Sequence, residues 1–407
     1  MANTFKFGNG EWAVGKETAL AYNDENSNFK PLPFTFDRAS TATVINKDGL
    51  IETVGTDEPR IDFLNNTKGH LLLEPSRTNK MPSSEDFNGA DWNRASLTIN
   101  SDDAISPYGT STADKITFTG NGSLRTWNTF TFTDAYTYSI FVKKGNSRYV
   151  TLRSFAFTTS AVIGFDLDTV TSETGGVIEQ YPNDWFRLSI SKDISSDADK
   201  NGYFYFYLPN NLGSTTSVSG NYAYIFGNQI EEGSYATSYI PTSGSTATRS
   251  AETIEQQTFL MEGLTDMAMF IDYELPNDKN PSDFRNQIGF RDNANANFYF
   301  IQFSNSEQME FRYRGTAGVN VDMTPTISEA TYGLRRKILY TKTGTTLKVF
   351  CNGVEVSSVT NSNATTFSST TENLNISNNY PKELNVRDWR LYNNGLTDQE
   401  AIALTTI

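Results

Sequence analysis

The sequence predicts an all-β protein in which tandem β-sandwiches follow a small β-rich N-terminal region. Apolar side chains recur at every second position of short segments, as at Tyr136, Tyr138, Ile140 and Val142. Turns rich in Gly, Asn and Asp separate these segments. No heptad pattern is present, so we expect no coiled coil.

Composition bounds the domain count and the class of partner. A chain of 407 residues is too long for one core, so two or three domains are expected. Its 13% aromatic and 20% charged residues suit compact domains and argue against disorder. A net charge of -14 repels phosphate backbones, so nucleic-acid binding is not expected. The single cysteine, Cys351, makes no internal disulfide and suits a small buried position.

The sequence also lacks signals that would direct it into or across a membrane. It begins without a basic segment followed by an apolar one, so we expect no secretory signal. No apolar run is long enough to cross a bilayer, so no membrane insertion is expected.

Residues 1–78 are predicted to form a small β-rich attachment or collar module. Short apolar pieces occur at 43–45 and 71–73. Asn46-Lys47-Asp48-Gly49 follows the first piece with residues typical of a hairpin turn.

Residues 79–250 are predicted to form a sandwich or jelly roll of many short strands. Alternating patterns occur at 136–142, 149–153 and 185–190. Residues 203–207 are aromatic at every position, which favours a central strand covered on both faces. A strand from Tyr224, then a turn and an extended exit around Pro241, close this domain.

Residues 251–407 are predicted to form a second sandwich. Strands are expected at 267–273, 298–303, 347–350 and 386–392. Asn352-Gly353 lies between two apolar runs and predicts a hairpin. Thr397 and Glu400 have the spacing of a capping box, which predicts a short helix through Leu404.

Several phrases resemble those of phage fibre and tail-associated proteins that carry carbohydrate-binding-like modules. They are 36–43 (FDRASTAT), 72–79 (LLEPSRTN), 224–233 (YIFGNQIEEG), 238–242 (SYIPT) and 248–249 (TR). The last third resembles the laminin-G and concanavalin-like lectins, most specifically in its tail NNGLTDQE. The resemblance implies a homotrimeric structural protein of the virion, in a head or tail fibre, that contacts other virion proteins and host surface polysaccharide.

Catalytic activity is not expected, so the protein is predicted not to be an enzyme. His70 is the only histidine and has no nucleophile elbow beside it, so a structural role is favoured over a catalytic one. Histidine and cysteine are too few for a zinc site. Carboxylates are plentiful: Asp166 and Asp168 share one face of a predicted strand, whereas the adjacent Glu231 and Glu232 point to opposite faces. A glycan depolymerase, a purely architectural protein and a bacterial secreted lectin are the alternatives.

One segment of the sequence has residues that suit a calcium site. Asp292, Asn293, Asn295 and Asn297 place oxygen-bearing side chains beside a predicted strand. The alternative is an Asn-rich turn that needs no metal.

Glycan binding would use exposed aromatic rings with polar neighbours. The candidates are Trp92, Trp127, Tyr181 and Tyr332. Trp92 and Trp127 lie in polar settings, whereas Trp185 alternates with its neighbours as a core residue does. For each candidate, packing in a core is the competing explanation.

Overall fold

The computed structural model describes residues 4–12, 14–15, 18–23, 28–257, 263–274, 287–292, 297–303, 309–325, 327, 334–367, 372–377 and 384–407. These residues form an all-β protein with one helix, α1, near the C-terminus, which confirms the predicted fold class. Among them, no helix has the length and apolar character needed to span a bilayer.

Contacts between residues divide the chain into two compact units. Unit 1 comprises residues 1–41, 54–76 and 250–407, and unit 2 comprises 42–53 and 77–249. This grouping differs from the predicted modules 1–78, 79–250 and 251–407, because most of the N-terminal region pairs with the C-terminal sandwich. β1 and β8 both pair with β32, and β4 pairs with β22.

Unit 1 contains the N- and C-terminal strands. They are β1 (Thr4–Gly8), β2 (Val14–Gly15), β3 (Thr18–Asn23), β4 (Asn28–Asp37), β7 (Arg60–Asp62), β8 (His70–Leu73), β22 (Thr253–Gln257), β23 (Met267–Glu274), β24 (Gln287–Asp292), β25 (Phe298–Phe303), β26 (Met309–Arg314), β27 (Val321–Met323), β28 (Arg335–Thr343), β29 (Thr346–Cys351), β30 (Val354–Thr360), β31 (Glu372–Ser377) and β32 (Leu384–Tyr392).

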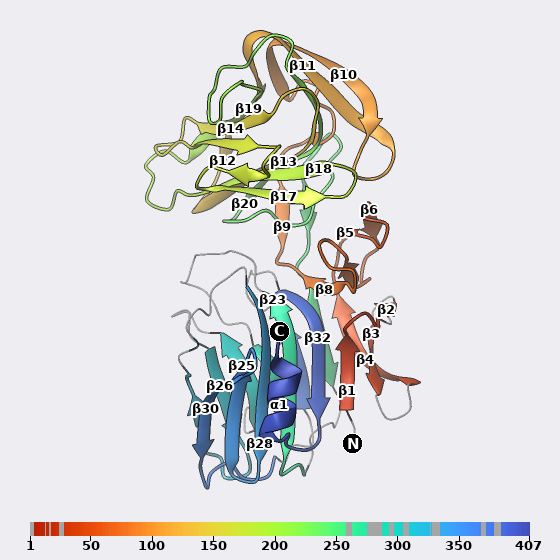
Figure 1. The fold of residues 1–407 in the computed structure, drawn as a ribbon, viewed down its shortest axis with the longest axis vertical. Coiled ribbons are helices and arrows are strands. Elements are labelled where there is room, and N and C mark those ends of the chain that lie inside the picture. Colours follow the sequence, from red (N-terminus) through yellow and green to blue (C-terminus); the bar gives the residue numbers. More distant parts are fainter. Residues whose placement is uncertain are drawn as a thin grey trace. The chain divides into compact units, whose positions relative to one another are not determined.

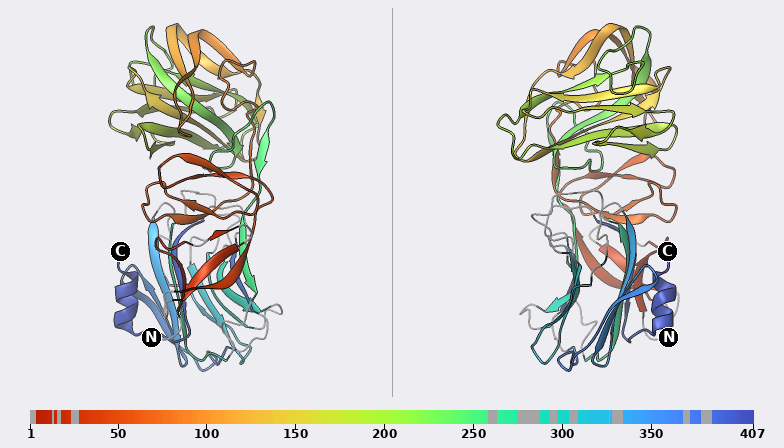
Figure 2. Two further views of the ribbon diagram at one scale, coloured as in Figure 1. Left: turned by 90° about the vertical axis from the view of Figure 1, so that its right-hand side faces the viewer. Right: turned by 60° about the vertical axis from the view of Figure 1, so that its left-hand side comes forward.

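These strands form two facing layers (Figures 1 and 2). The strand order in one layer is β30-β29-β28-β23-β32, and in the other it is β22-β31-β24-β25-β26-β27. The two layers are connected at one edge, where β1 pairs with β32 and β3, β3 pairs with β4, and β4 pairs with β22. Tyr299 of β25 stacks on Tyr340 of β28, with ring centroids 4.4 Å apart. The core therefore lies between the layers, as a sandwich requires.

β23 is covered on both faces because a helix packs on its outer side. Met269 and Ile271 belong to the core between the layers, whereas Ala268 and Phe270 pack with Ala401 of α1 (Asp398–Thr405). Figure 2 shows α1 outside the layer that contains β28. This explains why the strand is apolar at consecutive positions.

Unit 2 contains the remaining strands. They are β5 (Ala42–Ile45), most of β6 (Ile51–Val54), β9 (Arg77–Asn79), β10 (Trp92–Ile105), β11 (Ser111–Thr126), β12 (Phe130–Thr131), β13 (Ala135–Lys144), β14 (Tyr149–Phe155), β15 (Val162–Asp166), β16 (Thr171–Ser172), β17 (Gly176–Tyr181), β18 (Trp185–Asp193), β19 (Asn201–Tyr207), β20 (Tyr222–Glu232) and β21 (Ala247–Arg249).

The long strand β11 belongs to both halves of the unit 2 sheet. Its first part pairs with β20 and continues through β13, β18 and β17, and its last residues pair with β19 and continue through β14, β15 and β16. The halves face one another, because Tyr136 of β13 meets Phe204 of β19 edge to face at 5.1 Å. The predicted sandwich of short alternating strands is confirmed here.

One expectation about this sheet is wrong. The aromatic strand β19 is central, as predicted, but its outer face is covered only at its end, where Tyr207 is 6% exposed. Phe204 and Phe206 are fully buried in the core, whereas Tyr203 and Tyr205 on the opposite face are only half-buried. The phenylalanines of this run therefore pack in the core, while Tyr203 and Tyr205 lie on the outer face of the sheet.

Candidate functional site

Tyrosine and arginine side chains gather on the open face of the β14, β19 and β11 strands in unit 2. β19 lies between β14 and β11 in the sheet (Figure 1). Because side chains alternate along a strand, burying Phe204 and Phe206 directs Tyr203, Tyr205 and Tyr207 to the other face. Tyr203 and Tyr205 are half-buried there, whereas Tyr207, at the end of the strand, is only 6% exposed.

Strand register places an arginine on each side of Tyr205. Arg125 of β11 and Arg153 of β14 both lie directly opposite Tyr205. The Arg125 guanidinium carbon lies 4.5 Å from the Tyr203 ring centroid and 5.9 Å from that of Tyr205. The Arg153 carbon lies 4.5 Å from the Phe155 ring and 5.6 Å from that of Tyr205. Two cations thus share one central ring.

The rings also contact each other. Tyr205 and Tyr207 are stacked at 5.9 Å with an interplanar angle of 1°, and Phe155 meets Tyr205 edge to face at 6.1 Å. Burial raises the pKa of Tyr207, and Arg153 beside its hydroxyl opposes that rise. Phe155, at the end of β14, remains 43% exposed. These contacts hold the rings in place while parts of their surfaces meet solvent.

We call the set Arg125, Arg153, Phe155, Tyr203, Tyr205 and Tyr207 the tyrosine–arginine face. Its chemistry suits a ligand with flat apolar surfaces and hydrogen-bonding edges. Phenol rings stack on such surfaces, and each guanidinium offers several fixed N–H donors. Sequence reasoning missed these residues, although Trp127, one of its candidates, follows Arg125 by two positions.

The sequence-predicted aromatic candidates have different outcomes. Trp127 is 56% exposed and its backbone N–H donates to the Asp91 carbonyl at 2.7 Å. Tyr181 is half-buried and meets Phe141 edge to face at 4.9 Å. Tyr332 lies outside the described residues. Glycan binding by Trp127 and Tyr181 stays a prediction.

The exposed setting expected for Trp92 is wrong. Its ring is only 3% exposed and packs on Phe87 with centroids 5.2 Å apart. The polar residues beside it point away from a core that the sequence pattern did not reveal. Trp185 is buried, as expected, and so is Trp389.

The predicted calcium segment falls mostly outside the described part of the chain. Asn293 and Asn295 lie outside it, and of Asp292 only the backbone, at the end of β24, is described. Asn297 is buried just before β25. Within the described ranges, no group of three or more His, Cys, Asp or Glu side chains gathers as a metal site would require. Calcium binding stays a prediction.

The acidic residues considered for glycosidic chemistry have structural partners. Arg148 donates to both carboxylate oxygens of Asp166 at 2.6–3.1 Å, and this hydrogen-bonded pairing lowers the Asp166 pKa. Asp168 pairs with Lys144. Glu231 is fully buried and accepts hydrogen bonds from Gln229 and Thr237. Neither predicted acid pair is arranged as an acid and a base flanking a cleft.

Two charged residues of the phrases that carried the resemblance, Arg38 and Glu74, belong to a buried cluster of unit 1. The Glu252 carboxylate forms ion pairs with Arg38 at 2.8 Å and with Arg60 at 2.5 Å. Arg60 also forms an ion pair with Glu74 at 2.8 Å. All four side chains are at most 1% exposed. Two positive and two negative charges balance, which is the condition for burying them. These residues join separate chain segments of unit 1 and face no solvent.

His70 and Cys351 are also structural. Burial lowers the His70 pKa to about 3, and the charges of Arg387 and Arg60 act in the same direction. Burial raises the pKa of the Cys351 thiol, which disfavours the reactive thiolate.

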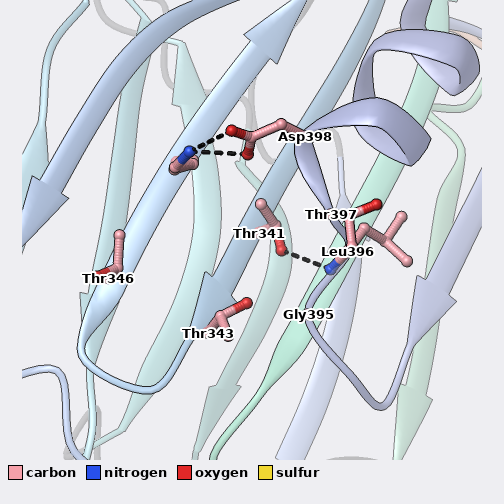
Figure 3. A pocket seen from close by; sticks show the side chains of 8 residues that line it. Thr341, Thr343, Thr346, Gly395, Leu396, Thr397 and Asp398 are labelled. Atoms are coloured by element: carbon pink, nitrogen blue, oxygen red, sulfur yellow. Dashed lines mark hydrogen bonds and ion pairs between the residues drawn. The ribbon is translucent and has the colours of Figure 1, made fainter.

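A pocket of about 270 Å³ lies beside the start of α1 in unit 1 (Figure 3). Its lining includes Thr341, Thr343, Thr346 and Thr397. The polar groups that Figure 3 connects already have partners: Lys348 donates to both oxygens of Asp398 at 2.7 Å, and the Leu396 N–H donates to Thr341 at 3.1 Å. The tyrosine–arginine face differs in that its arginines have no acidic partner among the described residues.

Comparisons with known proteins give distant structural matches. No family model and no curated protein matches the chain. The binding domain of Paraclostridial Mosquitocidal Protein 1 matches at 12% identity with a TM-score of 0.31, over 38% of this chain and 43% of that one. A Ruminococcus gnavus IT-sialidase CBM40 structure with bound α2,3-sialyllactose matches at 16% identity with a TM-score of 0.30, over 36% of this chain and 84% of that one. The botulinum neurotoxin serotype D binding domain matches at 12% identity with a TM-score of 0.32, over 37% of this chain and 39% of that one. At these scores the functional argument rests on the chain's own residues.

Proposed function

We propose that the protein binds glycans without cleaving them, and that the tyrosine–arginine face of unit 2 is the binding surface. The observation that carries this proposal is the pair of half-buried phenol rings, Tyr203 and Tyr205, on the outer side of β19, with an arginine over them from each neighbouring strand. The apolar faces of a sugar ring stack on aromatic rings, while its hydroxyls accept hydrogen bonds from guanidinium groups.

The resemblance of several sequence phrases to those of phage fibre proteins supports a biological setting for this activity. In that setting the protein is a virion component, assembles as a homotrimer with other virion proteins, and attaches the particle to host surface polysaccharide. Several copies of a weak site on one particle would raise the overall affinity by roughly 10²–10⁴. A low intrinsic affinity is therefore compatible with the role.

Binding of the full-length chain to an oligosaccharide array, followed by saturation-transfer NMR on the ligands found, tests the proposal. We expect Tyr205→Ala to weaken binding about tenfold, the size of one lost ring contact. Tyr222→Ala is the matched control, since Tyr222 is another half-buried tyrosine of unit 2 that lies under a cation, Lys115, at 4.4 Å. Absence of any glycan binding, or equal losses in both variants, would contradict the proposal.

Release of reducing sugar distinguishes binding from cleavage. We expect the protein to leave a bound polysaccharide intact, because the predicted acid pairs are engaged in ion pairs and buried hydrogen bonds. Turnover that disappears in a carboxylate variant would instead identify a depolymerase.

A further inference from the structure

We infer that the tyrosine–arginine face selects acidic oligosaccharides, whose carboxylate or sulfate groups are held by Arg125 and Arg153 on either side of Tyr205. This inference rests on the proposed function and names its ligand class. Its starting point is the absence of acidic partners for these two arginines.

The other arginines of unit 2 mostly have acceptors within the protein. Arg148 pairs with Asp166, Arg94 donates to the carbonyls of Phe87 and Gly89, and Arg187 donates to the Thr237 carbonyl at 2.6 Å. Arg125 and Arg153 contact aromatic rings instead, and neither forms an ion pair with any described residue. The Arg153 Nε is buried and has no hydrogen-bond partner among the described residues. Arg153 also bonds to the Tyr207 hydroxyl, but each guanidinium carries five N–H donors, so both arginines retain donor capacity for an external acceptor.

The residues that flank these cations in the strand rows of the described sheet carry no carboxylate. One row of residues crosses five adjacent strands in the order Asn93, Arg125, Tyr205, Arg153 and Val162. The neighbouring row includes Tyr207, Thr151 and Gly164, and the row on the other side includes Tyr203 and Phe155. Glu173 reaches the edge of this surface, where it accepts from the Gly164 N–H at 2.7 Å, but it pairs with neither arginine. The two arginines therefore add positive charge to a chain of net charge -14. Charge complementarity thus favours an anionic ligand.

The geometry matches an anionic sugar better than a simple ion. Neighbouring strands lie about 4.8 Å apart, so the two arginines are separated by about 10 Å at the backbone, with the Tyr205 ring between them. A sugar ring stacked on Tyr205 would place substituents toward either guanidinium. Stacking on rings keeps each guanidinium extended before the ligand arrives, which reduces the entropy lost on binding. Planar guanidinium groups bind carboxylate and sulfate oxygens in pairs.

Isothermal titration calorimetry of the full-length chain tests this with three oligosaccharides of equal length: an oligogalacturonate, its carboxyl-reduced neutral form, and a sulfated galactan fragment. We expect at least one acidic ligand to bind about tenfold or more tightly than the neutral form, and this preference to shrink in 0.5 M NaCl. The acid that binds more tightly identifies carboxylate or sulfate as the preferred group.

Variants assign the preference to the two arginines. Arg125→Gln and Arg153→Gln should each reduce affinity for the acidic ligand about tenfold and leave the neutral ligand within about twofold, since only a charged hydrogen bond is lost. Arg153→Lys should recover part of the loss, because it keeps the charge without the planar fork. Lys115→Gln is the control, since Lys115 lies over Tyr222 in the other half of the sheet.

The outcomes separate the two proposals. Binding of neutral and acidic ligands with equal affinity would overturn the acidic preference and leave glycan binding intact. An acidic preference that persists in both arginine variants would also overturn it, by placing the anion elsewhere. Failure of all three ligands together with an unreactive oligosaccharide array would overturn glycan binding itself.

Discussion

At the scale of single residues, the arginines of the two units take different partners. Arg38 and Arg60 are fully buried, and each lies within 2.8 Å of Glu252. A buried charge without a counter-charge is costly, and the Glu252 carboxylate balances these two arginines. Arg125 and Arg153 are half-buried at the surface and are supported by rings instead. The same residue type therefore stabilises unit 1 and forms a candidate binding surface on unit 2.

His70 gives a residue-scale prediction about pH. Its pKa in the folded protein is about 3, below the ordinary value of 6.5, so folding favours the neutral ring. The stability that this provides is complete above pH 6.5 and decreases as the pH falls toward 3. At pH 5 we expect the wild type to have lost about 2 kcal/mol relative to pH 7.5 through this residue alone.

Urea denaturation of the wild type and of His70→Gln at several pH values measures this effect. Glutamine has no titrating group, so the difference in unfolding free energy between the two proteins isolates the histidine. We expect that difference to move in favour of the variant as the pH is lowered from 7.5 to 5. A difference independent of pH would show that His70 titrates normally.

At the scale of elements, local signals were sufficient where the element is made by neighbours in sequence. Asn352 and Gly353 have φ angles of 49° and 84°, as the predicted hairpin between β29 and β30 requires. The capping box at Thr397 and the helix that it begins are also confirmed. In each case the residues that determine the structure lie within a few positions of one another.

Elements assembled from distant segments could not be predicted in the same way. The aromatic run at 203–207 predicted a central strand, but only the pairing of β19 with β11 and β14 shows which arginines flank it. Trp92 was misplaced for the same reason, because it is buried in the unit 2 core, which residues from distant strands such as Leu124 and Phe204 complete. Alternation along a strand identifies two faces, and the partners from other strands decide which face is open.

The C-terminal helix gives an element-scale prediction. The Glu400 N–H donates to Thr397 Oγ1 at 3.3 Å, and the Thr397 N–H donates to the Glu400 carboxylate at 2.9 Å. Thr397→Ala removes the first bond and should destabilise the helix by about 1 kcal/mol. Hydrogen exchange of peptides covering 398–405 should become faster. Thr397→Ser keeps the hydroxyl and should exchange as the wild type does; equal protection in all three proteins would contradict the capping role.

At the scale of the whole molecule, each of the two units has a large hydrophobic core of its own among the described residues. One lies between the layers of unit 1 and includes Leu347, and the other lies within the unit 2 sandwich and includes Leu152. Both leucines have no exposed surface. Two cores of this kind define two cooperative units, so we expect calorimetry to show two unfolding transitions.

Matched leucine substitutions assign those transitions. Leu347→Ala and Leu152→Ala each remove the same buried atoms and should each cost about 2–5 kcal/mol. Because the sites belong to different cores, we expect Leu347→Ala to lower the midpoint of the unit 1 transition and Leu152→Ala to lower that of the unit 2 transition. The double variant should show both shifts at their single-variant sizes. An acidic oligosaccharide bound to the tyrosine–arginine face should raise only the transition that Leu152→Ala lowers, since a ligand stabilises the unit that binds it. A single transition lowered equally by both substitutions would show that the cores unfold together, and a ligand shift in the other transition would place the binding surface on unit 1.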